Sequence, residues 1–248
     1  GKIVQLTAMP EMIALFNGMG GGAAATIAAV ELIKLTESAQ AQLPIVAVVL
    51  GLFGALIGSV SFSGSICAVV KLRDWLKKAT WFPAQQLVNT IVFITALALG
   101  TAFIFTHSTT IFTLFFIVSF IYGILMTIPI GGADMPVVIA LYNAFTGLAV
   151  ACEGYLLGNM AMIIAGMVVG SAGSLLTLLM ARAMNRSITN IIFSRFGVTD
   201  TGGAGAQGEM KSMEIDDAAI TMGYVSSVAI VPGYGMAVAQ AQQKVWEL

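Results

Sequence analysis

The sequence predicts an all-α polytopic membrane helix bundle with six spanning helices, followed by the start of a Rossmann-like α/β domain. The first observation is composition: 58% of the 248 residues are apolar and only 9% are charged, against about 25% charged residues in a typical soluble domain. The second is a series of six long apolar runs, and the third is a glycine-rich stretch followed by a strand–turn–helix pattern. Lipid rather than water must therefore surround most of the chain.

Each apolar run is long enough to cross a bilayer, which takes about 20 residues in a helix. The runs are continuous rather than alternating, so they predict helices instead of the strands of a barrel. Three of them begin at Pro10, Pro44 and Pro136, where a helix loses nothing through the missing N–H group. The predicted spans are Pro10–Ile33, Pro44–Val70, Leu87–Phe105, Ile111–Ile130, Pro136–Leu157 and Met160–Met184.

Positive charge predicts the orientation, because cytoplasmic loops carry an excess of lysine and arginine. The basic residues that follow the second span or surround the end of the sixth are Lys71, Arg73, Lys77, Lys78, Arg182, Arg186 and Arg195. The loops on the opposite side contain Lys34 alone. We therefore expect a multi-pass protein of the inner (plasma) membrane, with both ends of this segment in the cytoplasm.

Part of the chain repeats itself at an offset of 126 residues, because Met9–Asn17 resembles Met135–Asn143. Each copy is followed later by a helix that contains a Gly-Ser pair, at Gly64-Ser65 and at Gly173-Ser174. Small residues of this kind let helix backbones approach closely in lipid. In the predicted topology both copies run in the same direction. Transporters are often built from such repeats, with the working site where the copies meet.

A few polar residues interrupt the apolar spans. Asn17 and Asn143 occupy matching depths, where an amide either joins helices by hydrogen bonds or lines a hydrated path. Asp134 begins the fifth span and is either an N-cap or a carboxylate at the mouth of a channel. Glu153 lies near the other end of that span and is protonated, paired or able to reach water, because a charge deep in the bilayer costs about 2.5–3.5 kcal/mol.

The character of the chain changes after the sixth span. Ser187–Phe196 predicts a short amphipathic helix at the inner surface, and Gly197–Ser212, with five glycines, predicts a flexible linker. Beyond the linker we expect a helix over Glu214–Tyr224, a buried strand over Ser226–Val231 and a helix over Ala237–Trp246. The predicted domains are a transmembrane domain over residues 1–186, an interfacial helix and linker over 187–212, and a truncated nucleotide-binding domain over 213–248.

The stretch Pro232–Val238 follows the predicted strand and opens the predicted helix, which is the context of a dinucleotide fingerprint. Gly233 and Gly235 let the backbone approach a pyrophosphate, and the helix N-terminus offers N–H groups to it. Val238 departs from the small third residue of the usual pattern, so an ordinary glycine-rich turn is the alternative. With His107 as the single histidine and two cysteines far apart, no metal site can be assembled.

Three blocks of the sequence, Ile130–Val138, Ala183–Ser187 and Pro232–Gln242, resemble the beta subunit of proton-translocating NAD(P) transhydrogenases, in the same order and with similar spacing. The resemblance covers the whole chain. It implies hydride transfer between NADH and NADP+ while a proton crosses the membrane. It also implies an NADP(H) site on this subunit, an NAD(H) site on a partner alpha subunit, and a dimer of such assemblies.

The resemblance also implies roles for individual residues. Asn143 matches an asparagine of the proton path, and Asp134 matches an acidic residue at the cytoplasmic end of that path. Asn17 stands where many members have a histidine; asparagine cannot titrate, so a histidine of the companion subunit is expected to carry the proton in its place. Ser171 and Gly173 match a stretch that is sensitive for coupling. The residues that match the NADP fingerprint are Gly233, Tyr234, Gly235, Met236, Ala237 and Val238.

Two other functions are compatible with the residues themselves. The first is a secondary transporter with parallel repeats and a soluble regulatory tail, and the second is a membrane anchor whose polar residues only join helices. We expect the sequence to be a piece of a longer protein, because it has no initiating methionine and stops just after the fingerprint. On its own it is expected to be inactive.

Overall fold

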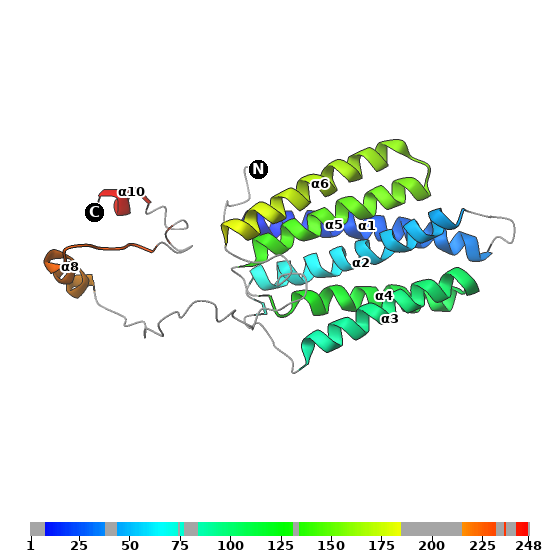
Figure 1. The fold of residues 1–248 in the computed structure, drawn as a ribbon, viewed down its shortest axis with the longest axis horizontal. Helices are drawn as coiled ribbons and strands as arrows, with labels where there is room; N and C mark the ends of the chain where they lie inside the picture. Colours follow the sequence, from blue (N-terminus) through cyan, green and yellow to red (C-terminus); the bar gives the residue numbers. More distant parts are fainter. Residues whose placement is uncertain are drawn as a thin grey trace. The chain divides into compact units, whose positions relative to one another are not determined.

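The computed structural model describes residues 8–37, 44–73, 75–76, 84–130, 134–184, 215–231, 236 and 242–247. The chain forms two compact units, residues 1–198 and 199–248. The first unit contains the helices α1 (Met9–Glu37), α2 (Ile45–Leu72), α3 (Gln85–Thr106), α4 (Thr109–Thr127), α5 (Met135–Leu156) and α6 (Met160–Ala183). These six helices lie side by side along the long axis of their unit (Figure 1).

All six predicted spans are confirmed as helices, and each is long and apolar enough to cross a membrane. Two boundaries differ by more than two residues at one end. α1 continues to Glu37 instead of ending near Ile33, because hydropathy marks the embedded part of a helix and not its polar last turn. α4 ends at Thr127 instead of Ile130, because the carbonyl groups after it accept hydrogen bonds from the side chain of Lys71.

The core of the bundle lies around α2 and α5. In their most apolar windows, 61% of the α2 residues and 67% of the α5 residues are buried, against 17% in both α3 and α6. α2 contacts α1, α3, α4 and α5, and α5 contacts α1, α2 and α6. Residues on α2 and α5 are therefore held by protein on several sides, whereas α3 and α6 lie at the edges of the bundle.

The sequence repeat is visible as two similar helix pairs, α1 with α2 and α5 with α6. In the first pair, Gly18 packs against Ser65. In the second, Ala144, which lies 126 residues after Gly18, packs against Gly173. Successive helices cross the bundle in alternating directions, so α1 and α5 run in the same direction, as the predicted parallel repeat requires.

Close packing of α5 on α6 gives the first testable prediction. A Cβ atom on Gly166 would collide with the backbone nitrogen of Ala151 and lie 2.6 Å from the carbonyl oxygen of Gly147, whereas a Cβ on Gly170 would have ordinary contacts of 3.4 Å or more. We therefore expect Gly166→Ala to destabilise the bundle by about 1–3 kcal/mol and Gly170→Ala to be tolerated. Thermal unfolding in detergent measures the difference, and equal midpoints for the two variants would contradict this packing.

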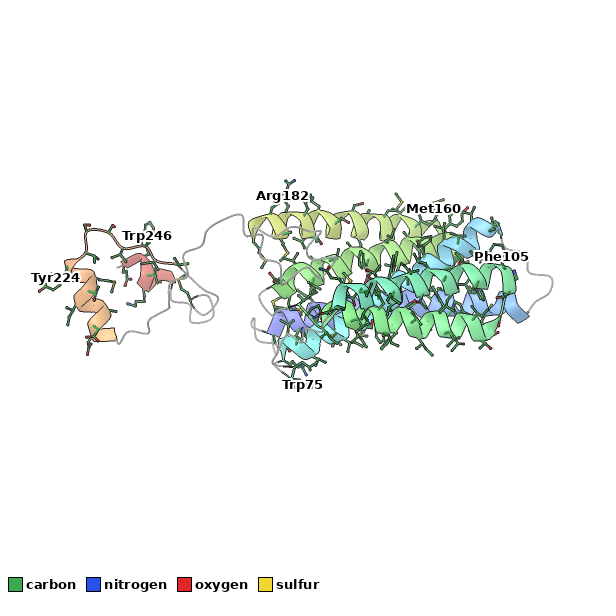
Figure 2. The ribbon with its side chains drawn as sticks, turned by 60° about the horizontal axis from the view of Figure 1, so that its bottom comes forward. Trp75, Phe105, Met160, Arg182, Tyr224 and Trp246 are labelled. Carbon is green, nitrogen blue, oxygen red and sulfur yellow. The ribbon has the colours of Figure 1, made fainter. Side chains whose placement is uncertain are left out.

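The ends of the bundle differ in their side chains. Trp75 and Arg182 lie at one end of the first unit, and Phe105 and Met160 lie at the other (Figure 2). Arg73 near the first end binds Glu11 at 2.9 Å and stacks over Trp75 at 5.7 Å. Of the basic residues that predict the cytoplasmic side, the described Arg73 and Arg182 thus lie at the same end of the bundle.

The second unit contains α8 (Ile215–Tyr224) and α10 (Gln242–Glu247). The predicted helix over Glu214–Tyr224 is confirmed apart from its first residue, whose placement is not described. The strand predicted over Ser226–Val231 is wrong, because these residues are exposed and have no regular structure. A strand needs a neighbour to satisfy its N–H and C=O groups, and the described part of the chain contains no strand. The start of a Rossmann-like fold is therefore not supported.

Part of the predicted organisation falls on residues that the structure does not describe. The amphipathic helix over Ser187–Phe196 and the linker over Gly197–Ser212 lie outside the described residues. Of the helix predicted over Ala237–Trp246, the described part lies within α10.

Candidate functional site

A buried amide joins α1 to α2 in the interior of the bundle. Asn17 is 8% exposed, and its Nδ2 atom donates hydrogen bonds to Ser65 Oγ at 3.0 Å and to Ser61 Oγ at 3.4 Å. Ser61 and Ser65 lie one turn apart on α2, so both hydroxyl groups reach the same face of α1. The amide oxygen of Asn17 is buried and has no hydrogen-bond partner among the described residues.

The same hydrogen bonds continue to α5. Ser61 Oγ lies 2.6 Å from Thr146 Oγ1 and donates to the carbonyl oxygen of Tyr142 at 3.0 Å. Thr146 also donates to the carbonyl oxygen of Asn17 at 3.5 Å. We call Asn17, Ser61, Ser65 and Thr146 the polar cluster. It joins three helices, including the first helix of each repeat copy.

Glycine brings these short side chains within reach of one another. A Cβ atom on Gly18 would lie 3.1 Å from the Cβ of Ser65, and one on Gly21 would lie 3.1 Å from the Cβ of Ser61. Serine side chains are short, so they contact the opposite helix only where the backbones approach this closely. The small residues of α1 therefore position the polar cluster as well as packing the helices.

A second buried contact extends from the polar cluster to α4. The hydroxyl group of Tyr142 lies 2.6 Å from Thr127 Oγ1, and both side chains are fully buried. Tyr142 is one turn from Thr146 on α5, so its ring lies beside the polar cluster. The ring lies against Gly64, where any side chain would overlap it.

The two asparagines of the repeat differ in their surroundings. Asn17 belongs to the polar cluster, whereas Asn143 is half-buried and has no hydrogen bond to the cluster among the described residues. The second helix of each repeat pair explains the difference. α2 lies in the core and offers Ser61 and Ser65, whereas α6 lies at the edge of the bundle. Ser174, which corresponds to Ser65 in the repeat, is exposed and donates to the carbonyl of Gly170.

Asp134 is buried at the N-cap position of α5, with 6% of its surface exposed. Its side chain accepts no capping hydrogen bond from that helix, although it has an interaction elsewhere. The segment before it is fixed by Lys71, which is itself buried and donates to the carbonyl oxygens of Ile128 and Ile130, the latter at 2.8 Å. The end of α2 thus holds the connection that leads from α4 to Asp134.

Lys71 gives the second testable prediction. Replacing it with methionine takes this donor from the buried carbonyl of Ile130 and the partly buried carbonyl of Ile128. The loss of a donor to a buried group costs about 1–3 kcal/mol. We therefore expect Lys71→Met to destabilise the bundle by about 2 kcal/mol or more. Lys34, whose ion pair with Glu31 is exposed, supplies the control, because Lys34→Met should cost less than about 1 kcal/mol. Equal losses of thermal stability in detergent would contradict the role of Lys71.

The remaining predicted residues lie apart from the polar cluster. Ser171 is exposed on α6 and donates to the carbonyl of Met167 within its own helix. Gly173 is buried, and a Cβ there would lie 2.7 Å from the backbone nitrogen of Ala144, so it holds α6 against α5. The predicted nucleotide-binding residues Gly233, Tyr234, Gly235, Ala237 and Val238 lie outside the described residues, and only Met236 is described.

Sequence reasoning missed part of the site. Thr146, Tyr142 and Thr127 were not singled out, because hydroxyl groups are common in spanning helices and usually bond to their own backbone. In the sequence, Ser61 and Ser65 have the spacing of small packing residues, which does not reveal that their hydroxyl groups bind Asn17. One signal was available: Tyr142 and Thr146 are four residues apart, on one face of a helix that begins with an aspartate.

Comparison with known proteins gives a consistent result. The whole chain, residues 1–248, matches the family described as NAD(P) transhydrogenase beta subunit. Two curated relatives, both the NAD(P) transhydrogenase subunit beta of Rhodospirillum rubrum and one of them from a named strain, are each 40% identical over 255 residues. The matched region covers 100% of this chain and 55% of each relative, so the chain spans about half the length of these relatives.

Proposed function

Because the chain belongs to the NAD(P) transhydrogenase beta subunit family, we propose that the intact protein works in a complex that couples hydride transfer between NADH and NADP+ to proton translocation. Its partner in this proposal is an alpha subunit that binds NAD(H), and the complex is a dimer of such assemblies. The six helices from α1 to α6 are able to span a membrane, so the chain belongs to a multi-pass membrane protein. The alternative of a secondary transporter gains no support from the comparisons.

The polar cluster is the observation that carries the membrane half of this proposal. It places an amide and three hydroxyl groups of three helices in one hydrogen-bonded group in the interior of a largely apolar bundle. Hydroxyl groups both donate and accept, so a chain of them passes a proton along by exchanging hydrogen bonds. The unpartnered amide oxygen of Asn17 accepts a water molecule or a protonated group of a neighbouring subunit.

Proton translocation is coupled to the nucleotides when the proton site and the nucleotide site both favour the same one of two conformations. A proton that moves through about 100 mV releases about 2.3 kcal/mol. In this proposal Asn17, Asn143 and Asp134 form the membrane part of the switch, together with Ser171 and Gly173 on α6. Asp134 lies at the end of the bundle that carries Arg182 and Trp75, which we assign to the cytoplasm with both ends of the chain.

The soluble half of the proposal concerns NADP(H). Residues 213–248 are proposed to begin the domain that binds it, and residues 187–212 to connect that domain to the membrane domain over 1–186. Gly233, Tyr234, Gly235, Met236, Ala237 and Val238 are the proposed contacts to the nucleotide, because their pattern matches a dinucleotide fingerprint. The hydride chemistry belongs to the nicotinamide rings themselves. The protein's task is to position them and to control when they meet.

A matched pair of serines tests the membrane half. Ser61 and Ser59 are both buried on α2, but Ser59 donates only to the carbonyl of Ala55 in its own helix. In the complete complex, reconstituted in vesicles, we expect Ser61→Ala to slow gradient-driven NADPH formation about tenfold or more, the scale of losing a proton-transferring group. Ser59→Ala should change the rate less than about twofold.

Further variants and an uncoupler complete the test. Asn143→Leu and Asp134→Ala are expected to reduce the same rate, and an uncoupler should remove the effect of the gradient. The proposed route is wrong if Ser61→Ala behaves like Ser59→Ala, or if Asn143→Leu and Asp134→Ala both retain the wild-type response. The proposed function itself fails if the wild-type rate ignores the imposed gradient.

A further inference from the structure

One carboxyl group is fully buried in the interior of the bundle. Glu153 on α5 is 0% exposed, and both of its side-chain oxygens are buried without a hydrogen-bond partner among the described residues. The sequence left three states open for this residue: protonated, paired, or close enough to the surface to reach water. In this conformation burial excludes contact with the surface, and the missing partners exclude an ion pair with any described residue. The protonated state of Glu153 is the one that remains.

The space around the carboxyl group is shaped by glycine. Glu153 Oε1 lies where a Cβ atom on Gly54 of α2 would be, and its Cδ lies 3.1 Å from that position. Gly54 is buried, so the glycine opens room for the acid at the contact between α2 and α5. Any other residue at position 54 would displace the carboxyl group.

The surroundings disfavour a negative charge at Glu153. The charged group that acts on it from α1 is Glu31, which is another acid, and Glu31 is itself bound to Lys34 at 2.6 Å. On its own helix the neighbouring ionisable group is the buried thiol of Cys152. Glu153 also lies in the last turn of α5, where the carbonyl ends of the helix repel an anion. A neutral carboxylic acid is therefore the stable form in the static structure.

Glu153 and the polar cluster lie along the same contact between α2 and α5. Glu153 follows Thr146 by seven residues, which is two turns, so the two side chains share a face of α5. On α2, Gly54 precedes Ser61 by the same seven residues. The separation is about 10 Å along the axis, with Ala149 and Gly58 between, and Asp134 lies on the far side of the polar cluster.

We propose that Glu153 is a proton-binding site of the membrane domain, on the side of the polar cluster away from Asp134. This inference rests on the proposed proton translocation. The carboxylic acid gives its proton to the hydrogen-bonded polar groups along α2 and α5 and becomes a carboxylate. It then takes a proton from the membrane face at its own end of the bundle, so no atom or electron is gained or lost over the cycle. Asn17 cannot titrate, and Glu153 supplies a group that can.

A structural role and a proton-binding role predict different effects of one substitution on proton translocation. A buried acid without partners costs free energy, so its replacement with an apolar side chain of similar size stabilises the fold. We expect Glu153→Met to raise the midpoint of thermal unfolding in detergent and to abolish proton translocation. If Glu153 only packed the helices, Glu153→Met would leave translocation unchanged.

The decisive experiment uses the complete complex of alpha and beta subunits in vesicles, with Glu153→Gln, Glu153→Asp and Glu31→Gln as variants. Proton uptake and NADPH formation are measured together, and infrared difference spectra report the C=O band of protonated carboxyl groups. We expect Glu153→Gln to lower proton uptake about tenfold or more and to remove one such band. Glu153→Asp should retain part of the uptake. Glu31→Gln, which changes a half-buried acid at the same end that is bound to Lys34, should resemble the wild type.

Two results separate this inference from the proposed function. If the wild-type complex ignores the gradient, proton translocation fails, and the infrared band still decides whether Glu153 binds a proton. If the wild-type complex responds but Glu153→Gln takes up protons normally and keeps every carboxyl band, the assignment of Glu153 is overturned.

Discussion

Asn17→Leu is expected to stop gradient-driven NADPH formation in the reconstituted complex, with a loss of about a hundredfold or more. Leucine is close in size but cannot donate to Ser61 and Ser65, which are 3.4 Å and 3.0 Å from the amide nitrogen. The substitution also removes the amide oxygen, which has no hydrogen-bond partner in the part of the bundle that the structure describes. The hydrogen-bonded connection between α1 and α2 is then lost, while the apolar packing around it remains.

The thermal stability of Asn17→Leu should barely change. A large loss of rate with little loss of stability distinguishes a residue of the proton path from one that only joins helices. Hydrogen bonds between spanning helices contribute about 0.6 kcal/mol each, and both serines can turn to carbonyl groups of their own helix. Asn89 on the peripheral helix α3 supplies the control, because its amide oxygen also lacks a partner but it lies outside the polar cluster. Asn89→Leu should keep the wild-type rate. A rate for Asn17→Leu within about twofold of the control would show that Asn17 only joins helices.

Gly64→Ala is expected to cause a large loss of stability, about 3 kcal/mol or more. A Cβ atom there would lie 2.6 Å from the hydroxyl oxygen of Tyr142 and 2.7 Å from one of its ring carbons. The ring cannot move away, because it is fully buried and its hydroxyl group is held by Thr127 at 2.6 Å. Thermal unfolding and the yield of folded protein in detergent measure the loss.

A second substitution should restore the stability. Tyr142→Leu removes the ring that collides with the new methyl group, and Thr127 keeps its hydrogen bond to the carbonyl of Gly123 at 2.7 Å. The double variant Gly64→Ala with Tyr142→Leu should therefore unfold closer to the wild type than Gly64→Ala alone. If the double variant is less stable than either single variant, the two residues are not in the predicted contact.

The spans could be predicted because the physics of a bilayer is simple. Every backbone group in lipid must be satisfied within its own helix, so apolar runs such as Pro44–Val70 determine where α2 lies to within two residues. The end of α4 could not be predicted from the same rule. It depends on Lys71, a residue 56 positions before Thr127 in the sequence, and hydropathy carries no information on such distant contacts.

The site was predictable only in part, because burial in a bundle depends on how helices assemble. The repeat places Asn17 and Asn143 at matching depths, yet Asn17 is buried against the serines of the central helix α2, whereas Asn143 is half-buried and has no bond to the polar cluster among the described residues. The strand expected at Ser226–Val231 fails for a related reason, because a β-rich segment forms a strand only beside another one. In both cases the sequence does not show which helix or strand will pack beside the residues in question.

The bond from Lys71 to the connection before Asp134 has a mechanical consequence. Ser61 and Lys71 belong to one uninterrupted helix, ten residues and about 15 Å apart along its axis. A helix of this length is stiff, so a small displacement of α2 along its axis at Ser61 produces almost the same displacement at Lys71. The residues bound by Lys71 before the start of α5 would be displaced by a similar amount. A change at the polar cluster would thus reach the end of the bundle without any rearrangement of the intervening side chains.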